Sequence, residues 1–158
     1  MTTVQNQQGI AKTSSLPAVY VASRASIPAR AAMWRKFRAA GANICATWID
    51  EDGEGQTECM TELWSRIEAE IRAAAHLVVY VESDDFPLKG AYIEVGMALG
   101  MGKQVFVVAP GVTLEAKSLR PLGSWAAHPR VRVLRSAEAA VFGNTSDAID
   151  LTAVLETA

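Results

Sequence analysis

The segment from Leu77 to Ala109, LVVYVESDDFPLKGAYIEVGMALGMGKQVFVVA, decides the fold class of this chain. It opens with a continuous run of apolar β-formers at 77–81, which is typical of a strand buried on both faces. A polar loop follows, and the segment at 91–101 predicts a helix. The next apolar run, at 103–109, predicts a second strand. Two strands joined through a helix predict a parallel β-α-β unit.

The same alternation extends over the rest of the chain. Apolar runs predict further strands at 16–23, 42–50 and 130–134. Helical segments are expected between and after these strands, at 26–41, 57–75, 136–142 and 146–157. This order predicts one α/β domain over 17–158, a flavodoxin-like doubly wound sandwich with a mainly parallel five-stranded sheet. The polar residues 1–16 predict a disordered leader.

Length, charge and cysteine content exclude several classes of protein. The chain has 158 residues and a formal net charge of −2, so neither nucleic acid polymers nor membranes are expected as partners. Its two cysteines, Cys45 and Cys59, are too few for a disulfide framework, and no Cys/His cluster predicts a metal site. The apolar runs are far shorter than a membrane span, and the N-terminus lacks a hydrophobic signal core. We therefore expect a cytoplasmic protein.

The expected fold predicts where a ligand would bind. In parallel α/β sheets, ligands lie beyond the carboxyl ends of the strands. That rule selects Ser23 and Arg24 after the first strand, 48–50 after the second, 82–85 after the third, and Glu94 in the next helix. Neither a GxGxxG fingerprint nor a Walker A loop is present, which disfavours dinucleotide-binding and P-loop enzymes.

Glu94 is the one carboxylate inside an apolar, glycine-flanked run. Gly90 precedes it by four residues, Gly96 follows by two, and Gly102-Lys103 leads into the next expected strand. Two interpretations stand. Glu94 is either a surface residue of an ordinary helix or an active-site carboxylate at the mouth of the sheet.

This pattern, together with VYVASR at 19–24 and EIRAAAHLVVYVES at 70–83, resembles the nucleoside 2-deoxyribosyltransferase family, which includes deoxynucleoside monophosphate N-glycosidases. The resemblance covers residues 17–109. It implies cleavage or transfer of the N-glycosidic bond of a 2′-deoxynucleoside or its 5′-monophosphate, without a cofactor. The family's motif glutamate is the nucleophile, so Glu94 would form a covalent deoxyribosyl ester. Near a helix N-terminus, such a carboxylate would be held ionised.

The resemblance also implies roles for other residues. Tyr20 occupies the position of a tyrosine that lies near the catalytic carboxylate, although a core tyrosine is an equal alternative. Asp84 and Asp85 lie where the family often has an acid that contacts the base or the sugar, and the sequence does not distinguish the two from each other or from a solvated turn. Ser23 and Arg24 would hold a 5′-phosphate.

Three more residues are expected at the substrate, namely Trp48, Asp50 and Gly90. Trp48 would stack on a nucleobase, unless it is a core residue. The resemblance implies a homo-oligomer, a dimer or larger, with Trp125 at the subunit interface. His76 departs from the family, since many relatives have Asp at that position.

Two alternative functions remain open from the sequence. A non-catalytic domain that binds or senses a nucleotide would also explain the pattern, and the departure at His76 leaves room for it. A TIR-like NAD-cleaving enzyme also combines such a sheet with a catalytic glutamate, but the GxxxExG…GK pattern fits it less well. Whether the chain is a transferase or a hydrolase is not readable from the sequence.

Overall fold

The computed structural model describes residues 16–51 and 59–156, so the predicted disordered leader falls almost entirely outside the described residues. Four strands form one parallel sheet in the order β1-β2-β3-β4. Their bounds are Val19–Ala22 for β1, His76–Tyr80 for β2, Gln104–Val108 for β3 and Val131–Leu134 for β4. The chain is therefore α/β with a parallel sheet, as the sequence predicts.

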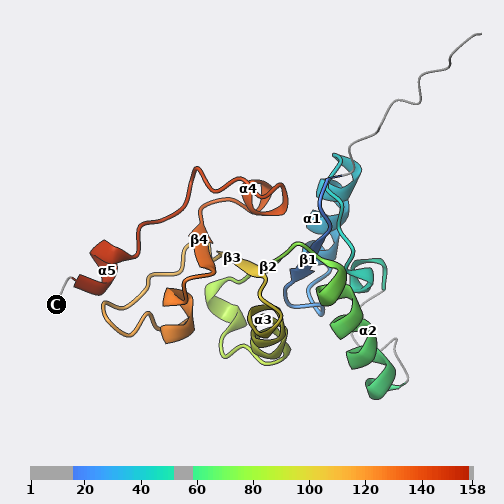
Figure 1. Cartoon of the computed structure of the whole chain (residues 1–158), viewed down its shortest axis with the longest axis horizontal. Helices are drawn as coiled ribbons and strands as arrows, with labels where there is room; N and C mark the ends of the chain where they lie inside the picture. Colours follow the sequence, from blue (N-terminus) through green and yellow to red (C-terminus); the bar gives the residue numbers. More distant parts are fainter. Residues whose placement is uncertain (1–15, 52–58, 157–158) are drawn as a thin grey trace, which may run out of the picture.

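Helices cover both faces of this sheet. The α-helices are α1 (Pro28–Ala39), α2 (Met60–Ala73), α3 (Gly90–Gly100), α4 (Ala137–Val141) and α5 (Thr152–Glu156). In Figure 1, α1 and α4 lie above the strands, whereas α2 and α3 lie below them. Side chains alternate between the faces along each strand. His76 and Tyr80 of β2 accordingly contact α4 and α1, while Tyr20 of β1 points to the other face and reaches α3.

The expected strand at 42–50 does not form, so the sheet has four strands and not five. The segment makes one parallel bridge with β1, between Ile44 and Val19, and then turns into the 3-10 helix η1 (Thr47–Asp50). Continued pairing would join the Thr47 N–H to the Val21 carbonyl. Instead, Trp48 Nε1–H donates to that carbonyl at 2.7 Å, and the Thr47 N–H faces the carboxylate of Glu70. Side-chain hydrogen bonds thus replace the backbone ladder.

The C-terminal helix is also shorter than the sequence predicts. The residues just before α5 lie beside the outer edge of β4, where Ala148 forms an antiparallel bridge with Leu134. The Ile149 N–H donates to the Val133 carbonyl at 2.8 Å. These contacts cover the open edge of the terminal strand, which would otherwise expose unpaired backbone groups.

The strands form the centre of the core. Val19, Val21, Val78 and Val79 are fully buried, as expected for strands covered on both faces. Within 16–51 and 59–156, every helix is too short or too polar to traverse a bilayer.

Candidate active site

A cavity of about 790 Å³ opens at the carboxyl ends of β1 and β2, between α2 and α3. Its volume lies in the range of pockets that hold small organic ligands. Every residue that the sequence predicts for the site lines this cavity, apart from Asp50. They are Tyr20, Ser23, Arg24, Trp48, Asp84, Asp85, Gly90 and Glu94.

Glu94 and Tyr20 lie side by side in the lining of the cavity. The Tyr20 hydroxyl donates to Glu94 Oε1 at 3.0 Å, from a side chain that is fully buried. Burial raises the pKa of Glu94 from its ordinary value of 4.5 to about 7, and the charge of Glu70 adds to the rise, while the Tyr20 hydrogen bond opposes it. Burial, followed by the charge of Glu94, also raises the pKa of Tyr20 well above its ordinary value. The expectation that the helix N-terminus holds Glu94 ionised is therefore wrong, because burial raises its pKa.

Gly90 opens the space in front of Glu94. The two residues are one helical turn apart, so they share a face of α3. A Cβ at Gly90 would lie 3.9 Å from the ring of Trp64, which is ordinary contact. The protein could accommodate a side chain at this position, but the side chain would occupy the cavity.

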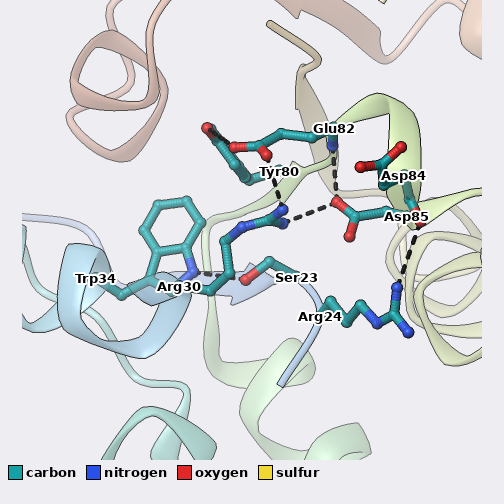
Figure 2. Close-up of polar contacts among 8 residues, drawn as sticks. All are labelled: Ser23, Arg24, Arg30, Trp34, Tyr80, Glu82, Asp84 and Asp85. Carbon is teal, nitrogen blue, oxygen red and sulfur yellow. Dashed lines mark hydrogen bonds and ion pairs between the residues drawn. The ribbon is translucent and has the colours of Figure 1, made fainter. Parts of the chain in front are cut away.

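The two adjacent aspartates, which the sequence leaves equivalent, have different surroundings. They lie in the 3-10 helix η2 (Ser83–Asp85) directly after β2. Asp85 is buried, and its Oδ2 accepts from Arg30 Nη1 at 2.8 Å and from the Glu82 N–H at 2.7 Å (Figure 2). Asp84 is exposed, and Arg24 approaches only its backbone carbonyl, at 3.4 Å. Asp85 is thus tied into the fold through Oδ2, while its Oδ1 is buried with no hydrogen-bond partner among the described residues. The carboxylate of Asp84 is exposed and available to a ligand.

Arg30 organises this loop from the opposite side of the sheet. Arg30 is only 5% exposed, although an arginine in the first turn of a helix is usually a surface residue. Besides Asp85, it pairs with Glu82 Oε2 at 3.3 Å and stacks over the ring of Tyr80 at 4.9 Å. The Tyr80 hydroxyl in turn donates to Glu82 Oε1 at 2.8 Å (Figure 2). Arg30 therefore fixes the loop that carries Asp84.

Ser23 and Arg24 form the rim of the cavity between β1 and α1. Trp34 Nε1–H donates to Ser23 Oγ at 2.9 Å (Figure 2). An indole N–H can only donate, so the Ser23 hydroxyl proton is free to point toward a ligand. The Arg24 guanidinium is exposed, and α1 begins a few residues later at Pro28. Together they offer hydrogen-bond donors suited to an anionic group.

Two tryptophans, Trp48 and Trp64, line the cavity. Trp48 is fixed there by its hydrogen bond to the Val21 carbonyl, and Trp64 of α2 lies nearby. Trp64 falls within the helix that the sequence predicts at 57–75, and helical spacing alone does not show which face of that helix borders a cavity. Asp50 points elsewhere and forms an exposed bidentate ion pair with Arg38, at 2.7 and 2.8 Å.

Sequence analysis missed two further carboxylates that line the cavity: Glu51, which pairs with Arg66 at 2.7 Å, and Glu70 of α2. Glu70 is half-buried, and the Thr47 hydroxyl donates to its Oε1 at 2.5 Å. Its charge contributes to the raised pKa of both Tyr20 and Glu94. The sequence signal, a glutamate on the apolar side of a helix, is too common to single it out.

Two other residues lie away from the cavity. His76 begins β2, at the opposite end of the strand, where its Nε2 lies 2.9 Å from the Ala140 carbonyl. Trp125 packs edge-on against Tyr92, with ring centroids 6.1 Å apart, and lines a separate apolar hollow beside α3. A role for Trp125 between subunits stays a prediction.

No protein-family model matches this chain, and no curated protein matches it significantly. Across the described ranges, 16–51 and 59–156, no group of three or more His, Cys, Asp or Glu side chains is arranged to hold a metal ion. The geometry of the cavity is therefore the basis for a functional proposal.

Proposed function

We propose that this chain cleaves or transfers the N-glycosidic bond of a 2′-deoxynucleoside or its 5′-monophosphate through a covalent deoxyribosyl–Glu94 intermediate. The observation that carries the proposal is the hydrogen bond from the buried Tyr20 hydroxyl to Glu94 Oε1, inside a cavity that suits a nucleotide in volume. A buried tyrosine that orients one carboxylate oxygen leaves the other oxygen free for attack.

The first chemical step follows from this arrangement. In it, Glu94 Oε2 forms a bond to the anomeric carbon C1′, and the C1′–N bond breaks with its electron pair leaving on the base, which takes up a proton from solvent. The Tyr20 hydroxyl holds the carboxylate in place while positive charge develops on the sugar. A carboxylate whose pKa is about 7 is ionised in a substantial fraction of molecules at neutral pH, and it is a better nucleophile for being poorly solvated.

The remaining parts of the cavity match the parts of such a substrate. Trp48 and Trp64 offer flat surfaces for a nucleobase, and Ser23 with Arg24 offers donors for a 5′-phosphate. Asp84 is the better candidate than Asp85 for contact with the leaving base or the sugar, because Arg30 already binds Asp85.

The test is to supply each common deoxynucleoside and its 5′-monophosphate, with and without a second free base, and to measure base release and exchange. We expect release or exchange by the natural chain and its loss in Glu94→Ala and Glu94→Gln. NAD is included, since nicotinamide release would instead support the TIR-like function. Ligand-dependent thermal stabilisation that persists in Glu94→Gln, with no turnover of any compound, would support a sensing domain and overturn the proposal.

A further inference from the structure

Glu70 approaches the cavity from a different helix than Glu94 does. Glu70 lies near the end of α2, whereas Glu94 lies on α3, and both side chains line the same cavity with Tyr20. The charge of Glu70 reaches both members of the Tyr20–Glu94 pair and raises the pKa of each. Glycosidases use a carboxylate besides the nucleophile to move the protons of the reaction, and Glu70 lines the same cavity as Glu94.

The orientation of Glu70 is set by the segment that leaves the sheet. The Thr47 hydroxyl donates to Oε1 at 2.5 Å, and the Thr47 N–H lies 3.3 Å from both carboxylate oxygens. This N–H is the group that would have paired with β1 had the expected strand formed. The local departure from sheet structure therefore positions a carboxylate in the cavity.

The other ionisable groups at the centre are unsuited to accept a proton from water. Glu94 is the leaving group once the ester has formed, and the Tyr20 hydroxyl, which carries its own proton, has a pKa well above its ordinary value. Asp85 is bound by Arg30 at 2.8 Å. Asp84 is exposed and is the residue proposed above for contact with the leaving base or the sugar, and Glu51 forms an ion pair with Arg66 at 2.7 Å.

We infer that Glu70 is the general base that activates water to hydrolyse the deoxyribosyl–Glu94 ester, an inference that rests on the proposed function. In this step the water oxygen forms a bond to C1′, and the bond between C1′ and the Glu94 oxygen breaks. Glu94 leaves as a carboxylate, and the proton from water passes to Glu70 and then to solvent. The products are free base and the deoxyribose or its 5-phosphate.

The test compares the natural chain with Glu70→Gln, which keeps the size of the side chain and an oxygen that accepts from Thr47. The probes are the deoxynucleosides and 5′-monophosphates, each supplied without an acceptor base. We expect Glu70→Gln to release about one base per chain in a rapid burst and then to turn over about 100-fold more slowly than the natural chain, a typical loss for a general base. Intact mass should show a deoxyribosyl group retained on Glu94.

Matched variants separate this role from a structural one. Glu68→Gln removes an exposed carboxylate of the same helix and should leave both phases unchanged. Thr47→Val removes one donor to Glu70 and should slow only the second phase. Azide, which attacks the ester without a general base, should restore turnover in Glu70→Gln but not in Glu94→Gln.

Each other outcome has a defined meaning. Three outcomes would contradict the role of Glu70 and leave the proposed function intact. Glu70→Gln could keep the steady rate of the natural chain, or it could lose the burst together with turnover. The natural chain could also show a burst and then no further turnover. If the natural chain releases no base from any probe, both proposals fall.

Discussion

Arg30 Nη1 and Asp85 Oδ2 form a buried ion pair 2.8 Å long, between residues 55 positions apart in the sequence. The pair connects α1 to the loop after β2 and engages Asp85, while Asp84 stays exposed. Removal of one partner of a buried pair leaves an uncompensated charge, which is costly.

We therefore expect Arg30→Met to lower the free energy of unfolding by about 3–5 kcal/mol. Arg38→Met is the control, because its ion pair with Asp50 is exposed and should contribute about 1 kcal/mol or less. Urea denaturation followed by circular dichroism measures both. Equal, small losses in the two variants would contradict the structural role given to Arg30.

The pH dependence of activity is predicted to move when Tyr20 is changed. The Tyr20 hydrogen bond lowers the pKa of Glu94 against the larger effect of burial, so Tyr20→Phe should raise that pKa above about 7. Since Glu94 attacks as a carboxylate, the acid limb of kcat/KM should shift to higher pH. Tyr92→Phe, whose hydroxyl contacts a backbone carbonyl outside the cavity, is the control. A shift to lower pH, or none, would disagree with this arrangement.

Stability should respond to Glu94 with a definite sign. Its pKa is about 7 in the folded chain and near 4.5 when unfolded, so the folded state binds more protons between these values and loses stability as pH rises through them. Glu94→Gln removes this penalty. We expect it to stabilise the chain by about 3 kcal/mol at pH 8 relative to the natural chain and by little at pH 4.5. Denaturation curves at both pH values test this, and a larger gain at low pH would refute the burial of a charged Glu94.

Gly90 and Gly96, on the same helix, allow a matched test of the cavity. Gly90→Leu should place a side chain in front of Glu94 and raise KM about tenfold or more, because the substrate loses room beside Trp64. The new Cβ in Gly96→Ala has no heavy atom within 4 Å. This variant should leave KM unchanged and stabilise the helix by about 0.5–1 kcal/mol. Steady-state kinetics of both variants measure KM, and thermal unfolding measures their stability. An unchanged KM in Gly90→Leu would place the substrate elsewhere.

Much of the fold is predictable from the sequence because the strands are continuous apolar runs. The β2-α3-β3 unit follows from 77–109, and the rule that ligands bind at carboxyl ends of parallel strands places most of the site. The segment 42–50 has the same apolar character, yet it forms η1. There, the indole of Trp48 and the contacts of Thr47 with Glu70 take the places of backbone pairs. Such side-chain competition depends on tertiary contacts and leaves no local signal.

The details of the site depend on partners distant in sequence. Asp84 and Asp85 are adjacent residues of the same type, so the sequence alone does not tell them apart. The contact of Asp85 with Arg30, on another helix, distinguishes them. Trp64 and Glu70 lie on α2 at positions that a helical pattern assigns to a face, but the pattern does not show that this face borders a cavity.

The most direct test of the central claim is to trap the intermediate. The natural chain is mixed with each deoxynucleoside and 5′-monophosphate, quenched in acid within one turnover, and analysed by intact mass and peptide mapping. The arrangement of Tyr20 and Glu94 predicts a deoxyribosyl group, with or without its phosphate, on the peptide that contains Glu94, and none in Glu94→Gln. Base release that proceeds without such an adduct and survives Glu94→Gln would contradict it.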